Sequence, residues 1–372
     1  MLRKTLSTSR LGLCALVLAC IAASAGSAST GSTDANPASG ARYAKEAGLG
    51  VQALQTAYVP ASGLYARPSG WWNSANAITV LVDYSRVTRS KQYVPAIANT
   101  FKKANKANGT SNFFNDYDDD EGWWALAWID AYDLTHKQAY LKMAETIFAN
   151  IAAEWEPATC GGGVWWKKPN EYKNAIANEL FLSVAASLAN RTHGRASTFY
   201  LNWAHKEWSW FKASGMINAQ NLVNDGLTST NPAACTNNGR TTWSYNQGVI
   251  LGGLVELSKA DHDPALLAQA DAIAKAAMTS IVVDGVLTES AVSGDDAPQF
   301  KGVFVRNLTA LYRAKPDAAY KTFIEVNADS ILMNDQGSKH EFGAQWHGPF
   351  DSFDATRQSS ALDVLVSAAA IQ

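Results

Sequence analysis

The chain repeats one local pattern, in which a strongly apolar segment ends, a short polar turn follows, and an amphipathic segment begins. In two of the turns a proline stands near the start of the second segment, where its missing N–H costs a helix little. Repeated helix-turn-helix units constrain the fold more than chain length does, because each unit buries its apolar face only against its neighbours. Five such turns occur, at residues 83–93, 130–140, 189–199, 257–264 and 311–316.

The segments on the two sides of these turns differ in polarity. Those before the turns are apolar on nearly every face, which is typical of buried helices, and lie at residues 75–83, 123–130, 176–188, 249–257, 303–311 and 361–371. Those after the turns carry one apolar stripe and a charged face, as at residues 140–151, 265–278 and 319–332, with residues 41–58 as the first of the set. Twelve helices in strict alternation predict an all-α fold: an (α/α)6 barrel of six inner and six outer helices, forming a single domain over residues 41–372.

The N-terminus has the layout of a secretory signal. Basic residues precede an apolar run at 11–23, and small residues follow at 23–28. We therefore expect a signal peptide over residues 1–28, a flexible leader over residues 29–40, and a secreted protein, extracellular or periplasmic. No segment approaches about 18 consecutive apolar residues, so we expect no membrane insertion. Lipidation of Cys20 is an alternative fate of the signal.

Removal of the signal peptide leaves two cysteines, Cys160 and Cys235. Export places them in a compartment that permits disulfides, so the simplest prediction is a bridge between them. Two free buried thiols are the alternative.

The charge balance excludes one class of partner. Lys and Arg number 31 and Asp and Glu 33, for a formal charge of -2, and no basic stripe is present. Binding to a phosphate backbone requires such a stripe, so nucleic acid is not an expected partner. We expect a monomer.

The connections from the amphipathic helices to the apolar ones are long, and all of them open on one face of the predicted barrel. Loops of that length are usually functional. A ring of aromatic side chains around a barrel mouth suits a carbohydrate cleft, because the C–H faces of sugars stack on flat rings. Anchoring of the loops is the alternative role for each ring. The aromatic residues of these loops are Tyr65, Trp71, Trp72, Phe113, Phe114, Tyr117, Trp165, Trp166, Tyr172, Trp243, Tyr245, Phe300, Phe342, Trp346 and Phe350.

The segment from Asp116 to Glu121 holds five acids in six positions at the start of an apolar helix. Acids favour a helix N-terminus, but this accounts for only one or two of them. A calcium loop could use Asp116, Asp118 and Asp120, yet it needs Gly in place of Glu121 and Glu in place of Ala127. We therefore expect neither a metal nor a cofactor.

Paired carboxylates are the best available chemistry, because no HExxH pair, G-x-S-x-G elbow, Walker A loop or complete G-x-G-x-x-G is present. Glycosidases need two carboxyl groups, which lie about 5 to 5.5 Å apart in retaining enzymes. With one carboxylate ionised, its neighbour tends to keep its proton at neutral pH and can act as the acid.

The string YDDDEGWWALAWIDAYDLT at residues 117–135 resembles the catalytic segment of glycoside hydrolase family 76, the endo-α-1,6-mannanases. The resemblance covers nearly all of the chain after the signal. It implies an (α/α)6 barrel that hydrolyses α-1,6-mannosidic linkages within mannan backbones with retention. Further matching blocks are CGGGVWW at 160–166, KNAIANELF at 173–181, WSYNQGVILGGL at 243–254, FKGVFVRNL at 300–308, and QSSALDVLV near the C-terminus.

The resemblance also implies roles for individual residues. Asp119 corresponds to the nucleophile and Asp120 to the acid/base. Asp118 departs from the family, which often has an aromatic residue there, so a pair formed by Asp118 and Asp119 stays open as an alternative register. The expected substrate-binding residues are Tyr117, Asp118, Trp165, Trp166, Tyr245 and Asn246.

Three other functions fit the sequence in part. A mannan-directed transglycosylase of the fungal wall would carry a C-terminal lipid-anchor signal, for which residues 361–372 are too short. A non-catalytic carbohydrate-binding barrel would not need the Asp pair. A polysaccharide lyase or uronyl hydrolase needs cations for acidic sugars, and the long loops offer mainly Arg67, Lys167 and Lys168.

Overall fold

The computed structural model describes residues 37–106, 109–228, 235–289 and 294–372. The predicted signal peptide, 1–28, lies outside these residues. The predicted leader, 29–40, overlaps the first helix, α1 (Pro37–Thr56), so the prediction of a flexible segment is wrong from residue 37 onward. The physical reason is a tertiary contact, since the Ser39 hydroxyl donates a hydrogen bond to Gln372 Oε1 (2.8 Å) at the C-terminal end of the barrel.

Six helices form a closed inner ring. Each packs against the next, and the last packs against the first, which completes the ring. Their side chains are buried on most faces, as the apolar segments predict. These helices are α2 (Trp71–Thr88), α4 (Asp118–Thr135), α6 (Ala175–Arg191), α8 (Ser244–Asp261), α10 (Ala297–Ala314) and α12 (Ala355–Ala370).

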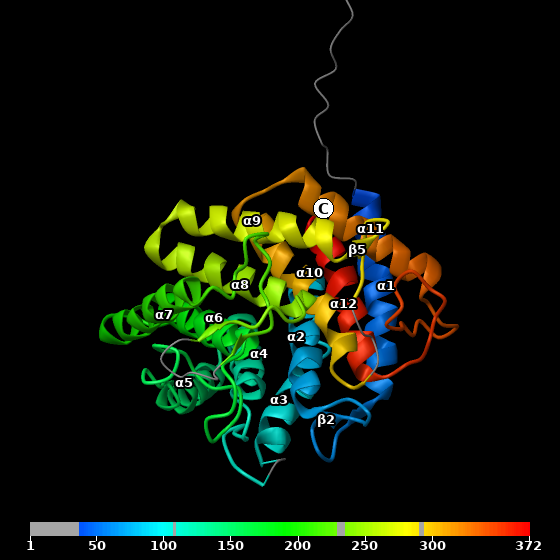
Figure 1. Ribbon diagram of the computed structural model, residues 1–372. Coiled ribbons are helices and arrows are strands. Elements are labelled where there is room, and N and C mark those ends of the chain that lie inside the picture. Colours follow the sequence, from blue (N-terminus) through cyan, green and yellow to red (C-terminus); the bar gives the residue numbers. More distant parts are fainter. Residues whose placement is uncertain (1–36, 107–108, 229–234, 290–293) are drawn as a thin grey trace, which may run out of the picture. The chain divides into compact units, whose positions relative to one another are not determined.

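The other six helices pack on the outside of this ring, each against one or two inner helices. Figure 1 shows the closure, with α1 in blue running beside α12 in red. The predicted (α/α)6 barrel, with inner and outer helices in strict alternation, is therefore confirmed. The outer helices are α1, α3 (Val94–Lys103), α5 (Gln138–Ala153), α7 (Arg195–Ser214), α9 (Pro264–Ser280) and α11 (Ala318–Asn334), and a 3-10 turn, η1 (Ala104–Lys106), follows α3.

Local signals explain where several helices begin. The side chains of Asn174, Asp263, Asp317 and Asp354 each accept a hydrogen bond from a backbone N–H in the first turn of the helix that follows. The inner helices approach closely where a glycine faces a neighbour. A Cβ at Gly302 would lie 2.4 Å from the Ser360 carbonyl oxygen, so α10 and α12 could not keep this distance with a larger residue.

The two ends of the barrel carry different connections. At one end the helices are joined by the short segments 89–93, 136–137, 192–194, 262–263 and 315–317, as predicted. At the other end the connections are long: 57–70, 104–117, 154–174, 215–243, 281–296 and 335–354. Three of these contain a two-stranded antiparallel hairpin, formed by β1 (Tyr58–Val59) with β2 (Leu64–Tyr65), β3 (Leu227–Thr228) with β4 (Thr236–Asn237), and β5 (Val282–Val283) with β6 (Val286–Leu287).

A disulfide joins two of the long loops. Cys160, in the α5–α6 loop, is bonded to Cys235, just before β4 in the α7–α8 loop. The predicted bridge is therefore present, and the alternative of two free thiols is not.

The aromatic residues predicted to ring the barrel mouth do not all lie there. Phe113, Phe342 and Trp346 have no exposed surface and Tyr65 has only 5%, so these four anchor loops and the prediction of a rim position is wrong for them. Phe113 shows the reason, because its ring packs against Trp124 and Trp128 of the inner ring. Other members of the set line the cavity described next.

Candidate active site

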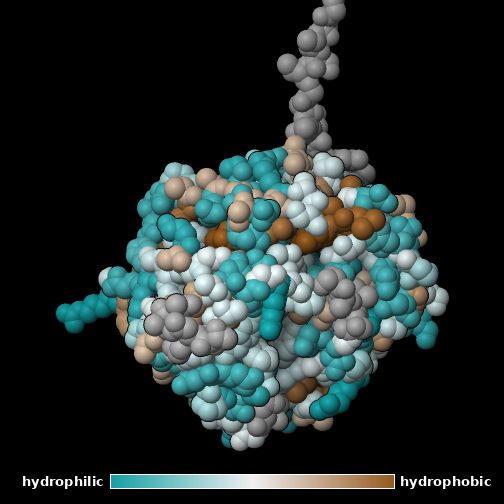
Figure 2. Space-filling model, in the orientation of Figure 1, coloured by the Kyte–Doolittle hydropathy of each residue, from teal (hydrophilic) through white to brown (hydrophobic). Residues whose placement is uncertain are grey.

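A cavity of about 690 Å³ opens among the long loops. Its walls come from the first turns of α2, α4, α8 and α10 and from the α5–α6 and α7–α8 loops. Figure 2 shows residues of intermediate and hydrophilic character, pale and teal, around the centre of this view, with hydrophobic residues above them. The aromatic lining residues are Trp72, Tyr117, Trp123, Trp166, Tyr172, Tyr245 and Phe300, and the polar ones are Asp119, Asp120, Glu171, Asn174, Asp225, Arg240 and Asp296.

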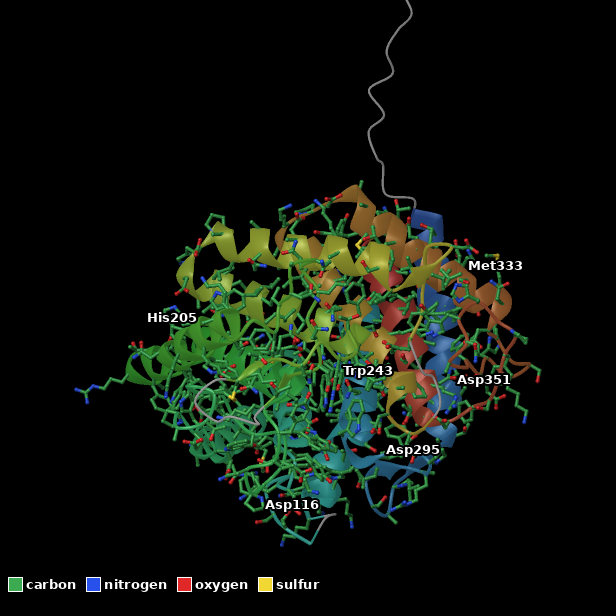
Figure 3. The ribbon with its side chains drawn as sticks, viewed as in Figure 1. Asp116, His205, Trp243, Asp295, Met333 and Asp351 are labelled. Atoms are coloured by element: carbon green, nitrogen blue, oxygen red, sulfur yellow. A yellow bond between two sulfur atoms is a disulfide. The ribbon has the colours of Figure 1, made fainter. Side chains whose placement is uncertain are left out.

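Loops far apart in the sequence meet at this face. In Figure 3, Asp116 marks the loop before α4, Trp243 the residue before α8, and Asp295 the loop before α10. Because the long loops and the starts of the inner helices share this end of the barrel, one cavity collects side chains from several of them.

The acidic segment forms the first turn of α4, which begins at Asp118. In a helix, residues three apart share a face. Asp118 and Glu121 accordingly lie together, fully buried, whereas Asp119 and Asp120 line the cavity. The structure therefore brings Asp119 and Asp120 to the cavity and directs Asp118 away from it.

A lysine accounts for the buried acids. Lys168 Nζ lies 2.7 Å from Glu121 Oε1, to which it donates a hydrogen bond, and 3.0 Å from Asp118 Oδ1. Glu121 also accepts hydrogen bonds from the side-chain amide of Asn150, at 2.7 and 3.0 Å, and from the backbone N–H of Asn115. Burial raises the pKa of Asp118 to about 8 against the opposing effect of Lys168, so Asp118 is mainly protonated at neutral pH.

The two cavity carboxylates have different hydrogen-bond donors. Asp119 accepts from the indole Nε1–H of Trp166 (3.0 Å) and from the backbone N–H of Asp120 (3.0 Å). Asp120 accepts from the side-chain amide of Asn115 at Oδ2 (2.6 Å), and no described donor bonds to its Oδ1. Donors stabilise an ionised carboxylate, so the surroundings favour the charge on Asp119 and leave an oxygen of Asp120 to hold a proton.

Burial raises the pKa of both carboxyl groups. For Asp119 the charge of Asp120 adds to the effect of burial, and the donors from Asp120 and Trp166 oppose it. For Asp120 the pKa rises to about 7, through burial and the charges of Asp296 and Glu121, against the opposing hydrogen bond from Asn115. Burial and mutual repulsion therefore both favour one protonated and one ionised carboxyl group, which is the combination that acid catalysis needs.

Three of the predicted substrate-binding residues reach the cavity. The ring of Tyr117 lies 5.2 Å from that of Trp166, measured between centroids, and both line the wall beside Asp119. Tyr245 stacks on Phe300 at 3.8 Å and also lines the cavity.

The other three do not line it. Trp165 is 5% exposed, and its ring covers the ammonium of the buried Lys173 at 4.5 Å. Asn246 is fully buried in the first turn of α8. Asp118 is turned toward Lys168, so none of these three residues lies on the cavity wall. The reason is a change of face, since neighbouring positions on a strand or a helix point in different directions.

Five polar residues of the cavity wall were missed in the sequence. Two of them accept hydrogen bonds from aromatic residues that were expected there: Asp296 Oδ1 from Trp72 Nε1–H (2.8 Å), and Asp225 Oδ2 from the Tyr172 hydroxyl (2.6 Å). Asp296 stands at the start of an inner helix, as the acidic segment does, and this position could have marked it in the sequence as a site residue. Asp225, Glu171, Asn174 and Arg240 lie in loops whose sequence carries no comparable signal.

Within the described ranges, no three His, Cys, Asp or Glu residues are grouped so that they could hold a metal ion. Asp116, Asp118 and Asp120, which have the spacing of a calcium loop, do not converge on one point. Asp118 is buried, whereas Asp120 faces the cavity. A search of the same residues finds no helix with the length and apolar character that crossing a bilayer requires.

Comparison with known proteins gives consistent matches. The sequence model described as glycosyl hydrolase family 76 matches residues 49–372. The mannan endo-1,6-alpha-mannosidase DFG5 of Candida albicans is 24% identical over 341 residues, which cover 82% of this chain and 73% of the relative. The mannan endo-1,6-alpha-mannosidase DCW1 of Saccharomyces cerevisiae is 24% identical over 83% of this chain and 74% of the relative.

Solved structures share the fold. An alpha-1,6-mannanase, GH76A of Salegentibacter sp. HEL1_6, superposes with a TM-score of 0.81 at 23% identity, covering 88% of this chain and 98% of that one. It is an inactive variant with two consecutive aspartates replaced by alanine, in complex with alpha-1,6-mannotetrose. Dfg5 from Chaetomium thermophilum, in complex with glucosamine, gives a TM-score of 0.78 at 21% identity, covering 88% and 90%.

Proposed function

Because the chain belongs to glycosyl hydrolase family 76, we propose that it is a secreted, retaining, endo-acting glycoside hydrolase that cleaves α-1,6-mannosidic linkages in mannan backbones. One observation carries the proposal: the adjacent carboxyl groups of Asp119 and Asp120 share a single cavity walled by aromatic rings. Such rings suit the C–H faces of pyranose sugars, and paired carboxyl groups are what glycoside hydrolysis requires.

In the first step, the ionised Asp119 attacks the anomeric carbon of the mannosyl unit. The bond to the glycosidic oxygen breaks, and Asp120 gives its proton to that oxygen, so the remaining chain leaves as an alcohol. The donors from Trp166 and the Asp120 backbone hold the Asp119 carboxylate. The product on the enzyme is a β-linked mannosyl ester.

In the second step, Asp120, now ionised, takes a proton from a water molecule as that water attacks the same carbon. The ester bond to Asp119 breaks, and the sugar leaves as the α-anomer. A pKa of about 7 suits Asp120 for both roles, because a group that titrates near the working pH can both give and take a proton.

The relatives support the choice of substrate. The two fungal relatives are named mannan endo-1,6-alpha-mannosidases, and the bacterial mannanase is in complex with an α-1,6-linked mannose oligosaccharide. That the bacterial variant was made inactive by changing two consecutive aspartates agrees with the roles proposed for Asp119 and Asp120.

Incubation of the protein with linear α-1,6-mannan tests the proposal, with products followed by mass spectrometry and by anomeric NMR in the first minutes. Short manno-oligosaccharides released as the α-anomer are expected. Initial release of the β-anomer would refute retention. Products longer than the substrate would point to a transglycosylase, and binding without cleavage to a carbohydrate-binding barrel.

Asp296 provides a pH-dependent prediction. Its charge raises the pKa of Asp120, which is about 7 mainly through burial. Activity should fall as pH rises through that value, because Asp120 then loses the proton it must donate. In Asp296→Asn the charge is gone, so the alkaline limb of kcat/KM should move a few tenths of a pH unit toward lower pH. The exposed neighbour Asp295 does not line the cavity, and Asp295→Asn should leave the profile in place. An unmoved limb in Asp296→Asn would contradict the assignment of the acid.

A further inference from the structure

The four acids in the first turn of α4 form two pairs, and Lys168 from the α5–α6 loop contacts only the buried pair, Asp118 and Glu121. Residues 166–168 run antiparallel to residues 116–118. The Asp118 N–H donates to the Trp166 carbonyl (3.0 Å), and the Lys168 N–H donates to the Asp116 carbonyl (2.8 Å). Residues two apart on an extended strand point to the same side. Trp166 and Lys168 thus both reach α4, the first at Asp119 and the second at Glu121.

Lys168 lies among acidic side chains. It contacts Asp118 and Glu121, and the charge of Glu154 at the end of α5 also acts on Asp118. Asn150 adds a neutral amide to the Glu121 carboxylate. Burial alone lowers the pKa of Lys168, but the two contacting carboxyl groups outweigh it and raise that pKa, so the lysine stays charged.

Loss of this cation would change the charge beside the cavity. Glu121 is fully buried and follows Asp120 directly in the sequence. With Lys168 in place, the charges of the ammonium and the Glu121 carboxylate cancel. Without it, the pKa of Glu121, which burial already raises, would rise further. Where Glu121 stays ionised, a buried negative charge would stand next to the pair that must hold one proton and one negative charge, or Glu121 would move toward solvent and disturb the first turn of α4.

On the basis of the proposed function, we infer that Lys168 is a positioning residue. It holds Asp118 and Glu121 on the buried side of α4, so that of the four acids in the first turn of α4 only Asp119 and Asp120 face the cavity, and it cancels the charge of Glu121 behind them. Lys168 does not line the cavity, so this role is separate from substrate binding.

Steady-state kinetics on α-1,6-manno-oligosaccharides over a range of pH test this role. In Lys168→Met, we expect kcat to fall about tenfold while KM stays within about twofold. We also expect the alkaline limb of the pH profile to move to higher pH, because an uncompensated Glu121 charge makes Asp120 hold its proton more tightly.

A second variant tests whether Lys168 acts through its charge or only by holding its loop in place. Lys168→Met combined with Glu121→Gln removes both charges and keeps an oxygen that can accept from Asn150. It should recover most of kcat and return the alkaline limb toward its original position. A lysine that only ties down its loop would give no such recovery. Lys142 forms an ion pair with Glu145 on the surface, and Lys142→Met should change neither parameter.

The outcomes distinguish the two proposals. A wild-type protein without activity on the oligosaccharides would overturn the proposed function itself. An active wild type whose Lys168→Met variant keeps both kcat and the pH profile would overturn the positioning role alone. Loss of activity in both Lys168→Met and the double variant, with both proteins folded by circular dichroism, would also overturn it.

Discussion

Asp119→Asn and Asp120→Asn are each expected to lower kcat on α-1,6-mannan at least about a thousandfold, with little change in thermal stability. Asn keeps the shape of the side chain but can neither form the ester nor transfer the proton. Both positions lie half-buried in the first turn of α4 at the cavity wall, so neither substitution changes the packing of the barrel core. Kinetics on α-1,6-mannan, together with thermal melts, measure both quantities.

Azide distinguishes the two roles. In Asp119→Ala, azide can replace the missing nucleophile and attack directly, so an activated α-mannoside should yield the β-mannosyl azide. In Asp120→Ala, the ester to Asp119 still forms, and azide that attacks it should yield the α-mannosyl azide. The opposite pattern of anomers would exchange the two assignments.

Asp116 provides a matched control from the same acidic segment. It is exposed and does not line the cavity. Asp116→Asn should therefore keep wild-type turnover. Comparable losses at all three positions would mean that the segment acts through its total charge, and would contradict the two-residue mechanism.

Trp166→Phe is expected to lower kcat by about a hundredfold while KM changes far less. The substitution keeps an aromatic face at the cavity wall but removes the indole N–H that lies 3.0 Å from Asp119 Oδ2. The indole N–H holds the Asp119 carboxylate ionised and in place, and misplacing a reacting group by about 1 Å can lower the rate on the order of a hundredfold. Trp166→Ala should additionally raise KM, because the face itself is lost.

Trp165→Phe provides the comparison for Trp166. Trp165 is the neighbouring residue of the same WW pair, but it packs over Lys173 inside the protein. Its variant should keep kcat and KM near wild type and lose some stability. A large loss of activity in Trp165→Phe with no effect in Trp166→Phe would contradict the geometry of the cavity.

The sequence was sufficient to predict the barrel. Helices that are apolar on all faces must be surrounded by other helices, and the amphipathic helices between them in the sequence can do this. The short turns make consecutive helices lie antiparallel. The contact of α12 with α2 confirms the closed ring. The start of α1 was missed because residues 37–40 look flexible by composition, and only packing at the far end of the chain makes them helical.

The candidate site could also be found in the sequence, since five acids in six positions are too costly to serve as a helix cap alone. The residues alone do not show which of Asp118, Asp119 and Asp120 face the cavity. That depends on Lys168, which lies about fifty residues away in the chain and meets Asp118 and Glu121 only because two loops pair as strands.

The sequence by itself thus determined the architecture, the end of the barrel that carries the site, and the class of reactive groups, because these follow from periodicity and composition, which are local properties. Tertiary structure alone decided which acids face the cavity, which of Trp165 and Trp166 reaches it, and that Asp225 and Asp296 join them. The physical reason is direction: a side chain's partners depend on where its Cβ points, and a shift of one residue on a helix or a strand changes the face on which it lies.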